Sequence, residues 1–400
     1  MLAINGGKTT RTRPFPHWPQ VTELDRELLE KTIRGGKWAN GGNRAAFEER
    51  FAADNKVKHC FAVTNGTVSL ELILRAYGIG RGDEVILPPY TFVATLSSVV
   101  FTGAMPVFAD IDPDTFQLSA DTLEEKITDK TKAIIAVAVG GCPPDIDAIE
   151  AIAKKHGVKF IVDAAQGVAA EWNGTSILAR GDAASVSCQN SKNLTSGEGG
   201  IITTNDDELA SKLALILDGG KLDGKYVSIA QNYRMNELCA AVLLGQYDKL
   251  AGEQYIRERN AAYLAGLMKS FDFISPCGYD DRITKHSYHL FLMKLNKEAF
   301  AEKGITRAQF LKAMCAEWVP FEPGYKPLYS FACTTSPDTV RTVGGRPDVT
   351  PLKNCEEVSY VTGCWFYQSM LLGPRGDIDL IAEALDKVWK HADDVRKIEV

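Results

Sequence analysis

The sequence lacks any run of 18 or more apolar residues, and the basic residues near its start are followed by no apolar stretch. We therefore expect neither a membrane-spanning helix nor a secretory signal. Positive charge is not in excess either, since 45 Lys and Arg stand against 51 Asp and Glu and the formal charge is −6. This balance offers no polybasic face to nucleic acid or to an anionic membrane, and it favours a small, neutral or locally held anionic ligand.

Paired cysteine motifs are absent too. The nine cysteines are an odd number without any CxxC pair, so they indicate neither a disulfide framework nor a zinc knuckle. We expect free thiols, no metal site and a soluble, cytoplasmic protein. With 45% hydrophobic and 24% charged residues over 400 positions, the composition excludes a disordered or fibrous chain. It is typical of a globular protein with one large core and a smaller one beside it.

Short apolar runs alternate with helical patterns from about residue 40 to 205. Each run is short enough for a buried strand and too short for a core helix. The alternation predicts an α/β fold with a mainly parallel, seven-stranded sheet covered by helices on both faces. The predicted strands are CFAVT (60–64), EVILP (84–88), PVFADI (106–111), KAIIAVAV (132–139), KFIVDAA (159–165), SVSCQ (185–189) and GGIITT (199–204).

Helical patterns dominate after about residue 206. The elements expected there are a long helix over 235–267, a strand over 287–295, a helix over 305–318, a loop rich in Pro, Gly and Thr over 319–354, and a terminal amphipathic helix over 378–392. We therefore divide the chain into an N-terminal segment (1–39), a large domain (40–265) and a small C-terminal α+β domain (266–400).

Polar residues that directly follow the strands form the candidate site, because ligands of an open parallel sheet bind beyond the carboxyl ends of its strands. The first strand leads through Asn65, Gly66 and Thr67 into a helix. Gly66 lets a ligand approach the backbone, and a hydroxyl beside a helix N-terminus suits a phosphate. A plain capped turn is the alternative at this position.

Two further strand ends carry ionisable side chains. Asp163 ends an apolar run, with Gln166 three residues on, and a carboxylate there needs a donor or a cation unless it caps the next turn. Ser187 and Lys192 lead into a loop of small residues, SCQNSKNLTSGEGG, whose glycines permit an unusual backbone path.

These three strand ends together predict a site for pyridoxal 5′-phosphate. The cofactor needs an amine for a Schiff base, an anion that keeps its pyridine nitrogen protonated, and donors for its phosphate. Lys192 supplies the amine, Asp163 the anion, and the turn at Gly66 and Thr67 with Ser187 the phosphate donors. A surface lysine is the common alternative, but it leaves the small-residue loop around Lys192 unexplained.

On these motifs the chain resembles the DegT/DnrJ/EryC1/StrS family of pyridoxal-phosphate-dependent sugar and cyclitol aminotransferases. The resemblance runs from about residue 14 to 395 and is densest at TNGTVSLELIL, GDEVILPPYTFVAT, VDAAQ, SCQNSKNLTSGEGG and QNYRMNELCAA. FPHWPQ and SCQNSK most resemble the branch of glutamine:scyllo-inosose aminotransferases and 3-amino-5-hydroxybenzoate synthases. The resemblance implies the aspartate-aminotransferase fold, fold type I.

Carried over by position, the resemblance assigns a role to each motif residue. It makes Lys192 the Schiff-base lysine and acid/base catalyst, and Asp163 the partner of the pyridine nitrogen. Gln166 would bind near the ring hydroxyl, and Phe92 would stack on the ring. Ser187, Gly66 and Thr67 would hold the phosphate. Asn232 or Arg234 of a neighbouring subunit would complete that phosphate site, which implies a homodimer with shared active sites.

The chain departs from the family pattern in two segments where a substrate would bind. Ala138 stands where many relatives have a histidine, and Gly140-Gly141 follow it. Tyr367 and Gln368 stand where members of the branch carry a pair of histidines. Elsewhere, His286 and His289 fall in the predicted strand over 287–295 or beside it, and their spacing of three would point them to opposite faces, which disfavours a shared metal.

The predicted activity is transfer of an amino group from L-glutamate or L-glutamine to a keto-sugar or keto-cyclitol by a ping-pong mechanism. Two alternatives stay open: a relative that dehydrates or aromatises a sugar-like substrate, and a catalytically silent pyridoxal-phosphate-binding regulator. Lys192 argues against the first, because family dehydratases lack the Schiff-base lysine. Retention of Lys192, Asp163 and the phosphate turn together argues against the second.

Overall fold

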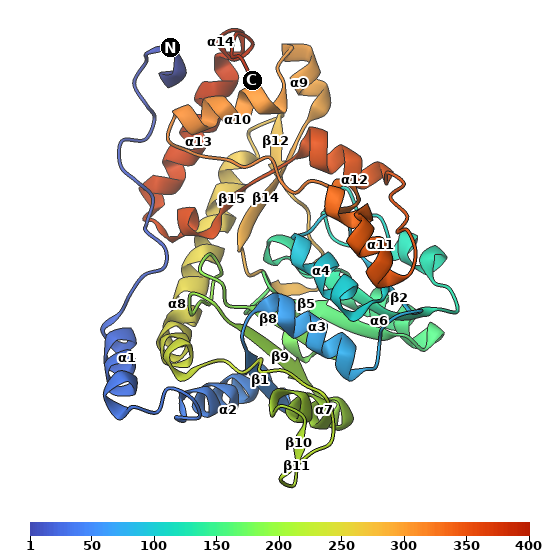
Figure 1. Cartoon of the computed structure of the whole chain (residues 1–400). Coiled ribbons are helices and arrows are strands. Elements are labelled where there is room, and N and C mark those ends of the chain that lie inside the picture. Colours follow the sequence, from blue (N-terminus) through green and yellow to red (C-terminus); the bar gives the residue numbers. More distant parts are fainter.

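A seven-stranded sheet forms the centre of the computed structural model, which describes residues 1–400 (Figure 1). Its strand order is β1-β9-β8-β5-β4-β2-β3. β9 runs antiparallel to both neighbours and the other pairings are parallel, so the mainly parallel sheet is confirmed. The strands are β1 (His59–Val63), β2 (Glu84–Leu87), β3 (Met105–Phe108), β4 (Thr131–Val137), β5 (Lys159–Asp163), β8 (Ala183–Ser187) and β9 (Gly200–Thr204).

Successive side chains of each strand enter two different cores. In β4, Ile134 and Ala136 belong to one hydrophobic cluster, whereas Ile135 and Val137 belong to the other, as the two-residue period of a strand requires. The first cluster takes side chains from α2 (Asn43–Asn55), α6 (Ile146–His156) and α8. The second takes them from α3 (Gly66–Ala76), α4 (Val93–Thr102) and α7 (Asp207–Leu217). Helices therefore cover both faces, as predicted.

The long helix α8 (Glu237–Met268) connects the sheet to the C-terminal part of the chain (Figure 1). Asn236 caps it by accepting a hydrogen bond from the backbone N–H of Cys239. Beyond it, the antiparallel strands β12 (Ile274–Pro276), β14 (Leu290–Leu295) and β15 (Gly363–Tyr367) form a second sheet. The third hydrophobic cluster lies against this sheet and takes side chains from the C-terminal part of α8, from α9 (Lys297–Lys303), and from α10 (Arg307–Ala316), α13 (Arg375–Lys390) and α14 (Ala392–Val395).

Two expectations about the C-terminal part are confirmed only in part. The strand predicted from residue 287 begins at Leu290, because Tyr288 has a left-handed backbone with φ 48°, and His286 and His289 therefore precede it. The segment 319–354 is not all loop, since α11 (Pro337–Val343) lies within it. Ser336 caps that helix and Pro337 begins it, which is a start signal that the low periodicity of the segment concealed.

The remaining elements are short or peripheral. They are α1 (Glu23–Gly35), α5 (Ala120–Leu123), β6 (Glu171–Trp172), β7 (Thr175–Ser176), β10 (Lys221–Leu222), β11 (Lys225–Tyr226), β13 (Ile283–Lys285) and α12 (Lys353–Glu357). The β10–β11 hairpin projects from the end of the molecule opposite the two termini (Figure 1). None of the helices is both long and apolar enough to span a bilayer.

Candidate active site

A cavity of about 740 Å³ opens at the carboxyl ends of the parallel strands. It lies where β5 and β8 end and where α3 and α4 begin, and β14 and β15 supply its other wall. Seven of the nine predicted site residues line it: Gly66, Thr67, Phe92, Asp163, Gln166, Ser187 and Lys192. The sheet therefore gathers side chains that lie up to 126 positions apart, counted from Gly66 to Lys192, at one edge.

Lys192 follows β8 in a turn where its backbone N–H donates to the carbonyl of Gln189 (2.9 Å). Burial lowers the pKa of its amine to about 8, because an ammonium is poorly solvated there, and the negative charge of Asp163 opposes that shift. An amine with this pKa is partly neutral, and so nucleophilic, near neutral pH.

Asp163 is the last residue of β5 and only 3% of its surface is exposed. One carboxylate oxygen accepts from the hydroxyl of Thr95 (3.0 Å) and the other from the backbone N–H of Ala165 (3.1 Å). Burial raises the pKa of Asp163, whereas these two donors and the charge of Lys192 lower it. A cation that enters the cavity and contacts Asp163 would therefore stabilise the charged form of its carboxylate further.

The amide of Gln166 is oriented at both ends. Its Oε1 accepts from the backbone N–H of Gly140 (2.7 Å), and its Nε2 donates to the hydroxyl of Tyr325 (3.0 Å). Gly140 has a positive φ of 69°, and an added Cβ would lie 2.7 Å from the side chain of Leu292. Gly140, one of the residues that depart from the family pattern, therefore donates the hydrogen bond that orients Gln166.

The N-terminus of α3 forms a cradle with Ser187. The side chain of Asn65 caps α3 by accepting from the N–H of Val68 (2.9 Å), and the backbone carbonyl of Asn65 accepts from the N–H of Ser69. The N–H groups of Gly66 and Thr67 at the start of the helix therefore have no helical partner. A Cβ on Gly66 would lie 2.7 Å from that of Ser187. The close approach of these two backbones, and a helix N-terminus directed at the cavity, suit an anion.

Phe92 is the N-cap of α4, and its side chain is half-exposed in the cavity wall. One helical turn further on, Thr95 reaches Asp163. The sequence analysis did not predict Thr95 as a site residue. Its position three residues after Phe92 is the signal that could have identified it, because residues three apart lie on the same face of a helix.

Asn232 and Arg234 do not line the cavity of their own chain. The guanidinium of Arg234 donates to the carbonyl of Leu217 (2.7 Å), and the side chain of Asn232 accepts from the N–H of Arg234 (3.3 Å). Asn232 is otherwise exposed, near the base of the β10–β11 hairpin.

Several lining residues come from the small domain and were not predicted. They are His289, Tyr325 and Trp365. Of the two substituted family positions near the C-terminus, Tyr367 lines the cavity. Gln368 instead is buried and accepts from Arg257 (2.8 Å), so it does not face the cavity.

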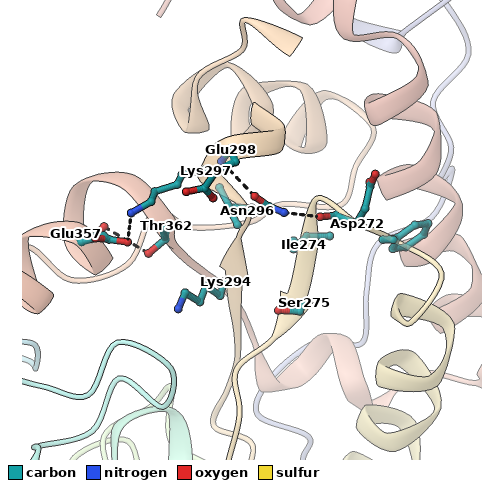
Figure 2. Close-up of a pocket in the computed structure, with 11 residues that line it drawn as sticks. Asp272, Ile274, Ser275, Lys294, Asn296, Lys297, Glu298, Glu357 and Thr362 are labelled. Carbon is teal, nitrogen blue, oxygen red and sulfur yellow. Dashed lines mark hydrogen bonds and ion pairs between the residues drawn. The ribbon is translucent and has the colours of Figure 1, made fainter. Parts of the chain in front are cut away.

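A second, shallower hollow lies on the small domain, between β12, β14 and α9 (Figure 2). Its cations are already paired: Lys297 contacts Glu357 (2.8 Å), and Lys294 contacts Asp114. The side chain of Asn296 likewise bonds to the carbonyl of Asp272 (2.9 Å). This surface has no perturbed acid or base comparable with those at Lys192, and it is not a candidate for catalysis.

The sequence is similar to those of known aminotransferases. Residues 19–341 match the profile of the DegT/DnrJ/EryC1/StrS aminotransferase family. The chain is 35% identical over 425 residues to the L-glutamine:2-deoxy-scyllo-inosose aminotransferase of Streptoalloteichus tenebrarius, covering 99% of both chains. It is 34% identical over 418 residues to the protein of that name from Streptomyces paromomycinus, covering 98% of both.

Solved structures give the same result for the fold. The crystal structure of 3-amino-5-hydroxybenzoic acid synthase superposes with a TM-score of 0.81 at 27% identity, covering 95% of this chain and all of that one. The structure of DesI with its TDP-sugar product gives 0.85 at 26% identity, covering 99% and 97%. From its family match, its relatives and its fold, the chain belongs to the DegT/DnrJ/EryC1/StrS aminotransferase family and is a pyridoxal-phosphate-dependent aminotransferase of fold type I.

Proposed function

We propose that the protein transfers an amino group from L-glutamine or L-glutamate to the keto group of a cyclitol or sugar by a ping-pong mechanism. One observation carries the proposal: the amine of Lys192 and the carboxylate of Asp163 share a buried cavity with the N-terminus of α3. The names of the relatives support glutamine as the donor and a keto-cyclitol as the acceptor.

The cavity fits pyridoxal phosphate. The absence of a Cβ at Gly66 lets Ser187 approach the N-terminus of α3, so that its hydroxyl and the free N–H groups of Gly66 and Thr67 would hold the phosphate together. The buried carboxylate of Asp163 suits a protonated ring nitrogen, and the half-exposed ring of Phe92 offers a face for stacking. Gln166 keeps one amide hydrogen for the ring hydroxyl, because its other polar contacts are made by Gly140 and Tyr325.

Bound pyridoxal phosphate supplies an aldehyde that captures amines and a ring that accepts electrons from the adjacent carbon. Lys192 would hold the cofactor through Nζ. The same Nζ, when free, would take the proton from the donor carbon that bears the nitrogen. Asp163 would hold the protonated ring nitrogen, and Thr95 and Ala165 orient its carboxylate by donating one hydrogen bond each.

Charge in the cavity favours an uncharged acceptor over a nucleotide-linked one. Among the lining residues, Asp163, Glu71 and Glu198 carry carboxylates, and Lys192 is the single lysine or arginine. A nucleotide diphosphate would need cations that this chain does not place there, whereas the hydroxyls of a cyclitol can bond to carboxylates and to tyrosines.

We further propose that two copies share their active sites. The β10–β11 hairpin and the segment after it expose large apolar side chains, with Tyr226 80% exposed and Ile229 completely so. Such a surface is typical of a subunit interface. Asn232 lies just after this segment and outside its own cavity, which supports a role in the phosphate site of the neighbouring subunit.

All nine thiols are unpaired, as a reducing compartment would leave them, and a cytoplasmic location stays a prediction.

The activity is tested by a visible absorption spectrum of the purified protein with pyridoxal phosphate, recorded before and after addition of L-glutamine or L-glutamate. We expect a visible band that one of the donors bleaches. Addition of 2-deoxy-scyllo-inosose, the acceptor in the names of the relatives, should then restore the band and yield an aminated product, while a TDP-linked keto-sugar should not. A band that neither donor changes would contradict the proposal.

A further inference from the structure

His289 is a buried histidine of the cavity wall to which the proposed reaction assigns no role. It is 3% exposed and lines the same cavity as Lys192. The residue before it, Tyr288, has a left-handed backbone with φ 48°. That conformation is unfavourable for a tyrosine and persists only where the surrounding structure enforces it, which makes the placement of His289 a specified feature.

Hydrogen-bond directions fix which nitrogen of His289 carries the proton. The side-chain Nδ2 of Asn193 donates to the carbonyl of Ser287 (2.7 Å), which can only accept. The Oδ1 of Asn193 therefore faces the Nδ1 of His289 at 3.2 Å. Because that oxygen is an acceptor, Nδ1 of His289 must be the donor.

The surroundings keep His289 neutral. Burial lowers its pKa well below the usual range, and the charges of Lys192 and Arg257 act in the same direction. Arg257 in turn contacts Glu253 (3.2 Å). On its other side, the backbone of His289 accepts from the N–H of Gln368 (3.1 Å), so main chain and ring are both held.

We propose that His289 is a positioning residue for Lys192. Its Nδ1–H donates to Asn193, the residue directly after Lys192, and thereby fixes the middle of the loop between β8 and β9 that carries the lysine. Asn193 is 4% exposed and is tied on its other side to Ser287, whose hydroxyl donates to the carbonyl of Val168 (2.6 Å). The small domain thus reaches the lysine loop through a continuous chain of hydrogen bonds. This inference rests on the proposed role of Lys192.

Two amide substitutions separate the two nitrogens of His289. In His289→Asn the amide nitrogen takes the place of Nδ1 and can still donate to Asn193. In His289→Gln the amide nitrogen takes the place of Nε2, and the bond to Asn193 is lost. The readout is the rate at which the cofactor-free full chain binds added pyridoxal phosphate, measured from the growth of the visible band. This rate is measured as a function of pH, because only the neutral amine of Lys192 reacts.

In the unaltered protein the capture rate should rise with pH with a midpoint near 8, the pKa of Lys192. We expect His289→Asn to keep this midpoint and His289→Gln to shift it upward by about one pH unit, because a loosened loop admits water and solvates the ammonium. Turnover with glutamine should fall about 100-fold in His289→Gln alone, as for a catalytic group displaced by about 1 Å.

Other outcomes overturn the proposal. Equal midpoints and turnover in both variants, or equal loss in both, would show that the Nδ1 bond does not set the position of Lys192. Loss in His289→Asn alone would assign the role to Nε2. If His289→Gln does not fold, Asn193→Ala removes the same bond from the other side and should give the same upward shift. Absence of capture by the unaltered protein would instead refute the proposed function.

Discussion

Asp163 and Lys192 influence each other's protonation, because both lose hydration in the cavity and the charge of each acts on the pKa of the other. The charge of Asp163 raises the pKa of Lys192, against the larger lowering by burial. In Asp163→Asn the opposing charge is gone, so we expect the midpoint of pyridoxal phosphate capture to fall below about 8.

The same variant should lose at least about 100-fold in turnover with glutamine, because the ring nitrogen loses its anionic partner. Thr95→Val is the matched control: it removes one hydrogen bond to Asp163 and keeps the carboxylate. Its capture midpoint should stay near 8. An Asp163→Asn protein with the normal midpoint and turnover would remove Asp163 from the mechanism.

Tyr325 has a proton to give to a ligand. Its oxygen accepts from Gln166, so its own hydrogen is not used in that bond. We expect Tyr325→Phe to lower kcat/KM for the keto acceptor about 10-fold, the effect of one lost hydrogen bond. Steady-state kinetics at varied acceptor concentration measures this effect. An unchanged kcat/KM would show that the hydroxyl does not contact the acceptor.

Residues at the ends of parallel strands could be predicted from the sequence, because strand ends converge on one edge of a sheet. Lys192, Asp163 and Ser187 were located in this way. His289 and Tyr325 could not be, since they enter the cavity from the small domain and no local pattern relates them to the sheet. For His289 the predicted strand was itself misleading, because the left-handed turn at Tyr288 ends the alternation.

At the scale of elements, the start of α3 has no room for an added methyl group beside Ser187. Gly66→Ala would place a Cβ 2.7 Å from that of Ser187. We expect a loss of about 1–3 kcal/mol in the free energy of unfolding, as for an overpacked core, together with weaker binding of pyridoxal phosphate. Thermal unfolding and a cofactor titration measure the two effects.

Gly266 provides the control within a helix. A Cβ there would meet no atom within 4 Å, so Gly266→Ala should stabilise α8 by about 0.5 kcal/mol and leave cofactor binding unchanged. If both variants bind the cofactor equally well, the start of α3 does not hold the phosphate.

The helices and strands that could be predicted from the sequence have a strong apolar periodicity or are apolar on both faces. The seven buried strands lie within a few residues of their predicted positions, because each is apolar on both sides and bounded by turn residues. The antiparallel direction of β9 is not encoded in such a run, since it depends on the path of the lysine loop before it. The segment over α11 was missed because only a cap and a proline mark it.

At the scale of the whole molecule, shared active sites predict complementation between two inactive variants. Lys192→Ala lacks the amine, and Asn232→Asp would place a carboxylate near the phosphate of the neighbouring site. Mixed dimers would then contain one intact site in two, so randomly exchanged subunits should recover about a quarter of the normal activity. Activity assays before and after subunit exchange check this.

Sedimentation measures whether each variant is a dimer, and a substitution in the exposed hairpin segment is the control. Ile229→Lys should weaken the dimer and prevent recovery, whereas Tyr360→Lys, an exposed residue elsewhere, should not. A mixture that never exceeds the sum of its separate components would exclude sharing of sites through Asn232.

The two ends of the polypeptide lie at the same end of the molecule, beside the small domain (Figure 1), and the amino group of Met1 lies 3.1 Å from Nε2 of His391. The lysine loop and the β10–β11 hairpin lie elsewhere in the molecule. Because both ends lie at this one end of the molecule, a flexible glycine-rich bridge would join them, and new ends would be opened at an exposed turn. The order of the polypeptide would change, while every side chain of the catalytic cavity would keep its neighbours.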